Sequence, residues 1–327
     1  MRPEWSPLAV VVALAVTTAC RAPEPKVSAP DAGAGDAASE LSESDASDAH
    51  QDQTSDQSFD RLPDVDDARA TPGCSLPGAA FEGAHEIVVA GKPRAFTIRL
   101  PAGYDPARPY PLVFGLHGAG GNGPSFGAYF PLVRGMEDAA IFVFPSALFY
   151  ELDGRTTWRY PTEENVAFFD ALVETITANL CVDRARIFAS GFSSGGFYSN
   201  TLGCRRGDVL RAIVPVAGGD RDFSDAEGND LCAGHVAVMV ISSPLDSTDP
   251  TGGPPGISHH QRGIRARDYF RVRNGCLDET DPIGDAGCVQ YRGCMPDAEV
   301  VYCEHGQGHA WPLELQAEAS RFVTRYR

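Results

Sequence analysis

Short apolar runs of strand length recur along the chain from about residue 86 and are bounded by glycine or proline. The first two, 86–90 and 94–100, flank Gly91-Lys92-Pro93 and predict a β-hairpin. The later runs are continuous in apolar and β-branched residues; they are 112–116, 141–144, 187–189, 212–216, 236–241 and 299–302. Continuous runs of this length predict strands that are buried on both faces of a parallel sheet.

Helical periodicity fills several of the gaps between these runs. In 165–180, apolar side chains recur at steps of three and four residues, which predicts an amphipathic helix. Further helices are predicted to begin at Ser194 or Gly195 and to span about 313–326. Strands that alternate with helices after an initial hairpin predict one α/β domain over 74–327, with a mostly parallel central sheet flanked by helices.

The first 20 residues predict an export signal. Arg2 provides a positive start, 8–16 is an unbroken apolar run, and small residues lead to Cys20. The run is shorter than the roughly 20 residues that a membrane-spanning helix needs. Cys20 lies where a bacterial lipoprotein carries its lipidated cysteine, and the segment resembles such a signal. We therefore expect a protein outside the cytoplasm, either extracellular or anchored to the cell surface by a lipid on Cys20.

Residues 21–73 have the composition of a disordered acidic linker. They are rich in Ala, Asp, Ser, Glu, Gln and Pro, and they hold too few apolar side chains to offset the entropy lost on ordering. They contain 13 acidic and 4 basic residues. The net charge of this segment is therefore more than half of the formal net charge of −17 of the whole chain. This charge disfavours nucleic acid as a partner, because its phosphates are negative too.

The cysteine count fits an oxidising compartment. The chain has nine cysteines, and the eight that remain without Cys20 are an even number, as expected for disulfides. A zinc site is the alternative interpretation. Because no C-x-x-C pair occurs, no metal is expected.

The main chemical signal is a G-x-S-x-G pattern formed by Gly191, Ser193 and Gly195, after the buried run 187–189 and at the start of a predicted helix. Glycines let the chain turn sharply from strand to helix, so that the serine hydroxyl is presented at the carboxyl edge of the sheet. We therefore predict that Ser193 is a nucleophile. The backbone N–H of Ser194, at the helix start, is predicted to stabilise an oxyanion.

His309 is the best candidate for the base that activates this serine. It lies in the loop 306–312, after the last predicted strand and before the last helix, where an imidazole can reach Ser193 across the sheet edge. The other histidines considered lack this placement; they are His305, His259 and His260.

The carboxylate of a triad is expected between the serine and the histidine in chain order. Asp246 is the first carboxylate beyond the run 236–241, and Asp249 is the alternative three positions later. Asp268 is interpreted as a charge on a helix surface. The chosen residue, Asp246, would orient the imidazole and stabilise its cation.

A glycine-rich turn, 117–123, follows the buried run 112–116. A turn at this place in such a sheet can supply a second oxyanion donor, which we assign to the Ala119 N–H. His117 is expected to organise the turn rather than to act as a base. A phosphate-binding loop is the alternative, but the turn lacks the Lys-Ser/Thr ending of a P-loop and the G-x-G-x-x-G spacing.

Together these motifs resemble the secreted feruloyl esterase and polyhydroxybutyrate depolymerase family of α/β-hydrolases, especially its fungal-type feruloyl esterases. The similar stretches are 94–104, 116–122, 181–196, 266–276 and 288–312. The resemblance implies an α/β-hydrolase fold in a single catalytic domain. It also implies the roles of nucleophile, acid and base for Ser193, Asp246 and His309.

The resemblance further implies a serine carboxylic ester hydrolase. Its expected substrate is a feruloyl ester of plant polysaccharide, with a polyhydroxybutyrate polyester or an acetylated xylan as the alternative. This chemistry needs no cofactor and no metal, and we expect a monomer. Trp158, Tyr160 and Trp311 are candidates for contacts with the acyl group or the sugar, or else for ordinary packing.

Two pairs of cysteines are suggested by their positions. A bond between Cys181 and Cys204 would brace the nucleophile strand and its helix, and Cys74 with Cys232 is a second candidate pair. The other four cysteines allow three connectivities.

Two other classes of function fit the sequence less well. A surface binding protein on a degenerate hydrolase fold would not need Ser193, Asp246, His309 and the glycine turn together. A serine peptidase of this architecture usually carries a propeller domain, and nothing in the chain resembles one.

Overall fold

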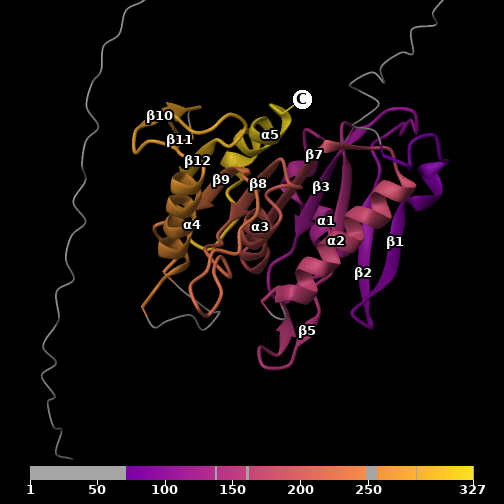
Figure 1. Cartoon of the computed structure of the whole chain (residues 1–327), viewed down its shortest axis with the longest axis horizontal. Helices are drawn as coiled ribbons and strands as arrows, with labels where there is room; N and C mark the ends of the chain where they lie inside the picture. The colour runs from indigo at the N-terminus through magenta and orange to yellow at the C-terminus, as the bar shows by residue number, and fades with distance from the viewer. Residues whose placement is uncertain (1–70, 137, 160–161, 248–255, 285, 327) are drawn as a thin grey trace, which may run out of the picture. The chain divides into compact units, whose positions relative to one another are not determined.

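Ten strands form one sheet within the part of the chain that the computed structural model describes, residues 71–136, 138–159, 162–247, 256–284 and 286–326 (Figure 1). Their order across the sheet is β1-β2-β4-β3-β7-β8-β9-β12-β11-β10. The strands from β4 to β12 in this order are parallel, and the two at either edge are antiparallel to their neighbours. The bounds are β1 Gly83–Val89, β2 Lys92–Arg99, β3 Tyr110–Leu116, β4 Ile141–Pro145, β7 Val182–Phe192, β8 Ala212–Val216, β9 Ala237–Ser242, β10 Thr280–Ile283, β11 Cys288–Tyr291 and β12 Val300–Glu304.

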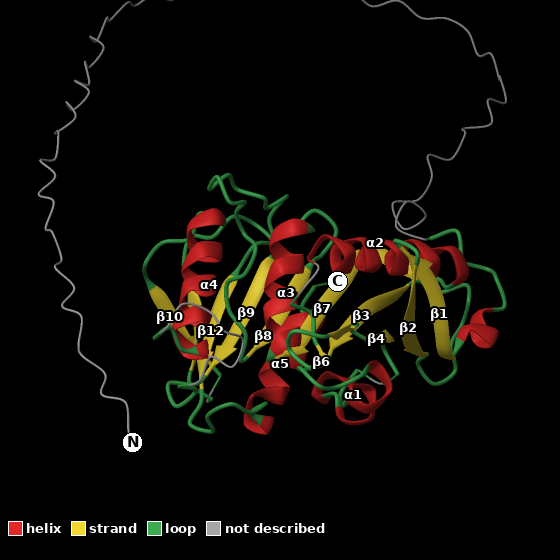
Figure 2. Ribbon diagram, turned by 90° about the horizontal axis from the view of Figure 1, so that it is seen from below, coloured by secondary structure: helices red, strands yellow, loops and turns green. Residues whose placement is uncertain are grey.

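Helices cover both faces of this sheet (Figure 2). On one face lie α2 (Thr162–Asn179), α3 (Ser194–Arg205) and α4 (His259–Arg273). On the other face lie α1 (Gly123–Tyr129) and α5 (Gln316–Thr324). The smaller elements are the paired strands β5 (Phe149–Tyr150) and β6 (Arg155–Thr156) and the 3₁₀ turns Gly78–Phe81, Pro131–Val133 and Leu313–Leu315.

Side chains of the central strands alternate between the two helical layers. On β9, Val238 and Val240 pack in the layer of α2, α3 and α4, whereas Ala237, Met239 and Ile241 pack in the layer of α1 and α5. All five side chains are fully buried. Because both faces are covered, such a strand needs apolar residues at every position, which explains the continuous runs in the sequence.

The predicted α/β domain is confirmed, since the hairpin forms β1 and β2 and each later run overlaps a strand. The nucleophile strand β7 is longer than predicted and begins at Val182. The elements without a counterpart among the predictions include α1, β10 and β11 as well as the short strands β5 and β6. The strand β10 is largely exposed and contains Pro282, and α1 has only seven residues, so neither element gives a clear period.

Four disulfides pair the eight cysteines of the described domain, and two of them correct the predicted connectivity. The bonds are Cys74–Cys181, Cys204–Cys232, Cys276–Cys294 and Cys288–Cys303. The predicted bonds Cys181–Cys204 and Cys74–Cys232 are therefore wrong.

Backbone hydrogen bonds explain the observed pairing. The Gly73 N–H donates to the carbonyl oxygen of Thr177 at 2.9 Å, which holds the segment that precedes the first strand against the end of α2, close to Cys181. The Ala233 N–H donates to the carbonyl oxygen of Cys204 at 2.7 Å, which brings Cys232 to the end of α3. In both pairs, a backbone contact of a loop brings the two cysteines together, and the spacing of the cysteines in the sequence does not reveal that contact.

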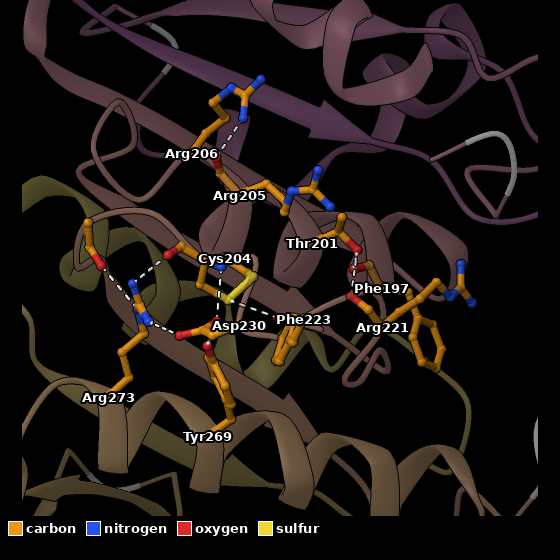
Figure 3. Close-up of a disulfide and its surroundings, with 12 residues drawn as sticks. Phe197, Thr201, Cys204, Arg205, Arg206, Arg221, Phe223, Asp230, Tyr269 and Arg273 are labelled. Carbon is orange, nitrogen blue, oxygen red and sulfur yellow. Dashed lines mark hydrogen bonds and ion pairs between the residues drawn. A yellow bond between two sulfur atoms is a disulfide. The ribbon is translucent and has the colours of Figure 1, made fainter. Parts of the chain in front are cut away.

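The Cys204–Cys232 bond and Asp230 fasten the loop after β8 to α3 and α4 (Figure 3). The Tyr269 hydroxyl donates to Asp230 Oδ1 at 2.7 Å, and Arg273 Nη1 pairs with Asp230 Oδ2 at 2.6 Å. Arg273 also donates to the carbonyl oxygen of Cys232 at 2.8 Å. One covalent bond and one charged cluster therefore fix this loop at the same place.

Four disulfides are typical of a protein that folds in an oxidising compartment outside the cytoplasm. The predicted export signal, Cys20 and the linker up to residue 70 lie outside the described residues. In the part of the chain that is described, no helix is both long and apolar enough to cross a bilayer.

Candidate active site

Ser193 stands at the sharp turn between β7 and α3. Its backbone has φ 55° and ψ −117°, a strained conformation for a residue with a side chain. The glycines on either side are sterically required, since a Cβ on Gly195 would lie 2.0 Å from the carbonyl oxygen of Leu116 and one on Gly191 would lie 2.4 Å from that of Gly195. The turn therefore presents the half-buried Ser193 side chain at the carboxyl edge of the sheet.

The structure brings Ser193, His309 and Asp246 into one hydrogen-bonded chain. The distance from His309 Nε2 to Ser193 Oγ is 2.9 Å, and the distance from His309 Nδ1 to Asp246 Oδ2 is 2.7 Å. Ser193 follows β7, Asp246 follows β9 and His309 follows β12, so the carboxyl ends of three parallel strands supply the three side chains. The order and spacing match those of a nucleophile, a base and an orienting carboxylate.

The Asp246 carboxylate is buried, with 2% of the residue exposed. Burial by itself would raise the pKa of Asp246, but its interactions with the side chains of His259 and His309 outweigh burial and lower this pKa to about 2. Asp246 therefore stays ionised over the pH range in which a histidine base operates. An ionised carboxylate can accept the Nδ1 proton of His309 and favour the cation that forms when His309 takes a proton.

The glycine turn after β3 lies directly beside the nucleophile. A Cβ on Gly118 would lie 3.6 Å from the Cβ of Ser193. His117 Nδ1 donates to the carbonyl oxygen of Gly118 at 2.7 Å, and His117 Nε2 accepts from the Ala147 N–H at 3.0 Å. Burial lowers the pKa of His117 to about 4, so the ring is neutral and holds the turn, as expected from the sequence.

Ser194 contributes differently from its neighbour. Its hydroxyl is buried, shares a hydrogen bond of 2.9 Å with the Thr157 hydroxyl, and accepts from the Trp158 N–H at 3.1 Å. The hydroxyl is therefore engaged in packing beneath the turn. The backbone N–H of Ser194 is the first of α3, where a helix leaves its N–H groups available to an external acceptor.

The three aromatic residues proposed as substrate contacts occupy different positions. Trp158 is 2% exposed, stacks on Tyr198 with ring centroids 4.7 Å apart, and donates to the carbonyl oxygen of His117 at 2.9 Å, so its indole belongs to the core. Trp311 is half-buried, two positions after His309, and packs on Phe130 with ring centroids 5.7 Å apart. Tyr160 and the alternative acid Asp249 lie outside the described residues.

His259 is the main feature of the site that the sequence did not assign. It is the first residue of α4, is 1% exposed, and has its ring centroid 4.7 Å from that of His309. Its Nδ1 lies 3.4 Å from Asp246 Oδ1 and 3.2 Å from His309 Nδ1. Ser258 with Gln261 three positions later is a capping-box signal that could have indicated this helix start, but it does not show that the start meets Asp246.

Two groups of side chains are close enough to share a metal ion among the described residues. Asp246, His259 and His309 offer ligand atoms within 4.8 Å of one another, but a cation there would displace the Nδ1 proton of His309. The second group contains Cys204, Asp230 and Cys232, and its two sulfur atoms form a disulfide. Ligand atoms of both groups are thus already engaged in other bonds, a hydrogen bond between His309 and Asp246 in the first group and a disulfide in the second.

The chain has clear relatives among known proteins, although no family model matches it. Feruloyl esterase C of Emericella nidulans is 32% identical over 251 residues, which are 73% of this chain and 84% of the relative. A probable feruloyl esterase C of Aspergillus niger is 33% identical over 265 residues, which are 78% of this chain and 89% of the relative.

Solved structures show the same fold. An acetyl xylan esterase from Aspergillus awamori matches with a TM-score of 0.59 and 13% identity, over 74% of this chain and 99% of the other. At this identity the likeness concerns the fold, a mostly parallel sheet between helices. On the similarity to the two relatives, the chain belongs to the feruloyl esterase family of α/β-hydrolases and is a carboxylic ester hydrolase of the serine type.

Proposed function

We propose that this protein hydrolyses feruloyl esters of plant polysaccharide, with Ser193 as nucleophile, His309 as base and Asp246 as the orienting carboxylate. The observation that carries the proposal is the continuous chain from Ser193 Oγ through His309 to Asp246, with distances of 2.9 and 2.7 Å. The similarity to feruloyl esterases C supports the substrate class.

Acylation of the enzyme is the first half of the proposed reaction. His309 Nε2 takes the proton of Ser193 as Oγ attacks the ester carbonyl carbon, and Asp246 stabilises the imidazolium. The N–H groups of Ala119 and Ser194 hold the oxyanion, and the loss of one such donor typically costs about 3 kcal/mol of transition-state stabilisation. The ester C–O bond then breaks, and the alcohol leaves with the proton from His309.

Deacylation repeats the same steps with water. His309 removes a proton from a water molecule, whose oxygen attacks the acyl carbon on Ser193. The bond to Oγ breaks, Oγ recovers the proton from His309, and the carboxylic acid departs. The imidazole of His309 carries the proton in each step, and water is the second reactant.

The substrate is tested by comparing kcat/KM on three esters. We expect methyl ferulate to be cleaved at least about tenfold faster than acetylated xylan or hydroxybutyrate oligomers, because a site shaped for an aromatic acyl group gains apolar burial that an acetyl group cannot offer. The half-buried indole of Trp311 is proposed as one contact for that acyl group. A preference for acetylated xylan or for the oligomers would instead assign one of the two alternative substrates.

The proposed location is outside the cytoplasm, which the four disulfides support. In this proposal 1–20 is the export signal, 21–73 is a solvated tether, 74–327 is the monomeric catalytic domain, and Cys20 carries a lipid. When the chain is exported from a bacterial host, mass spectrometry is expected to find a mature N-terminus at Cys20 with added acyl mass. The control Cys20→Ala should lack that mass, and an unmodified Cys20 in the wild type would contradict the anchor.

A further inference from the structure

His259 lies where the acid and the base of the site meet. Its side chain is fully buried between Asp246, His309 and the ring of Phe197, whose centroid is 5.5 Å away. Asp246 comes from the loop after β9, His309 from the loop after β12, and Phe197 from α3. An imidazole enclosed by three separate elements has a defined orientation. The positions of its two nitrogen atoms therefore indicate which groups they can hydrogen-bond.

The proton positions follow from the contacts of the Asp246 carboxylate. Oδ2 accepts from His309 Nδ1, whereas Oδ1 is buried and makes no hydrogen bond within standard geometry to any described residue. A buried carboxylate oxygen without a donor is costly. The polar atom that faces Oδ1 is His259 Nδ1, at 3.4 Å, a distance that is long for a hydrogen bond and within range for an ionic contact.

The second short contact of His259 supports the same arrangement. The Nδ1 atoms of His259 and His309 lie 3.2 Å apart, and both point toward one carboxylate. His309 needs its proton on Nδ1, because its Nε2 must accept from Ser193. If the Nδ1 of His259 also carries its proton, both N–H groups converge on Asp246, one on each oxygen, and no buried oxygen is left without a donor.

We propose that His259 is a positioning residue, whose Nδ1–H holds the second oxygen of Asp246 and so keeps the carboxylate in line with His309 during the reaction. This inference rests on the proposed roles of Ser193, His309 and Asp246. His259 acts through the carboxylate. Contacts that are long in the enzyme without substrate often shorten when the transition state forms, which fits a distance of 3.4 Å.

The backbone around His259 is built to keep the ring in place. Ser258 caps α4 with a reciprocal capping box, in which Gln261 N–H donates to Ser258 Oγ at 3.2 Å and Ser258 N–H donates to Gln261 Oε1 at 2.9 Å. The His260 N–H approaches the carbonyl oxygen of Asp246 at 3.4 Å. The start of α4 thus also contacts the backbone of the loop that carries Asp246.

The test compares two substitutions of nearly equal shape. His259→Asn keeps an N–H donor near the position of Nδ1, and His259→Leu replaces the donor with a methyl group. We expect His259→Leu to lower kcat about tenfold with KM within twofold, and His259→Asn to remain within about threefold of the wild type. The matched control is His260→Leu on the next residue, which is expected to leave kcat within twofold.

The pH profile separates positioning from a merely structural role. Among the residues that the structure describes, Asp246 and His309 are titratable groups in contact with His259, and α3 contacts it through the uncharged ring of Phe197. Without a donor on Oδ1, the charge of Asp246 acts more strongly on the His309 cation. The acid limb of kcat/KM should therefore move to higher pH in His259→Leu and return in His259→Asn.

The outcomes distinguish this inference from the proposed function. Equal losses in the Asn and Leu variants with an unmoved acid limb would overturn the positioning role, and so would full activity of His259→Leu. If His259→Leu does not fold, His259→Phe supplies a ring without a donor and is expected to show the same loss and the same shift. A failure of the proposed function is recognised separately, by turnover in an enzyme that lacks the Ser193 hydroxyl.

Discussion

Replacement of Ser193 by alanine is expected to lower kcat for ester hydrolysis by about a millionfold, to a residual rate that comes from binding and the oxyanion donors alone. The reason is that Ser193 Oγ is the group that His309 Nε2 meets at 2.9 Å at the sheet edge. The measurement is kcat on a nitrophenyl ester, with the thermal midpoint as a check on folding. The substitution removes one oxygen from a half-buried side chain, so the fold should persist.

A covalent probe provides the control for this prediction. A fluorophosphonate should label the wild type at Ser193 and leave Ser193→Ala unlabelled, whereas Ser224→Ala, at an exposed loop serine, should keep both labelling and activity. Turnover that survives in Ser193→Ala, or a label found on another residue, would assign the nucleophile elsewhere.

The second large effect is expected for Asp246→Asn, which should lower kcat about 10⁴-fold. An amide in place of the carboxylate can present its NH₂ group to His309 Nδ1, which favours the tautomer with the proton on Nε2. That tautomer cannot accept the proton of Ser193. The loss should persist at every pH, because the amide does not ionise, whereas the wild-type carboxylate, with its pKa lowered to about 2, stays charged throughout the working range.

Two matched variants make this result specific. Asp268 lies on α4 with its side chain 45% exposed and pairs with Arg267, so Asp268→Asn is expected to keep nearly full activity. Asp249→Asn tests the alternative acid from the sequence. Loss of activity in Asp249→Asn together with retention in Asp246→Asn would transfer the role of the acid to Asp249.

The candidate site was accessible from the sequence where its signals are local or follow from strand order. The pattern of glycines around Ser193, which follows a buried apolar run and precedes a helix, located the turn between β7 and α3. Asp246 and His309 were placed because parallel strands end at one edge of a sheet, and the first carboxylate and the loop histidine after two such strands must lie there. The continuous apolar runs revealed these strands for the same reason, since both of their faces are covered.

The remaining features depend on contacts between distant segments. The hydrogen bond from Gly73 to Thr177 holds Cys74 close to Cys181, and no sequence periodicity predicts that hydrogen bond. His259 meets Asp246 because a helix start folds back onto the acid loop. Residue type alone also does not tell whether an aromatic side chain faces a ligand, and Trp158 packs beneath the turn instead.

Asp246 and His309 lie in the loops that follow two neighbouring strands, β9 and β12. These strands pair in parallel, with Glu304 opposite Ser242. The His305 N–H extends this pairing by donating to the carbonyl oxygen of Ser242 at 3.2 Å. Asp246 and His309 are separated by 63 positions along the chain. The sheet holds both ends of this segment, so the segment's own length does not set the distance between the two side chains. A change in the length of the β10–β11 hairpin should accordingly leave the spacing between carboxylate and imidazole unchanged.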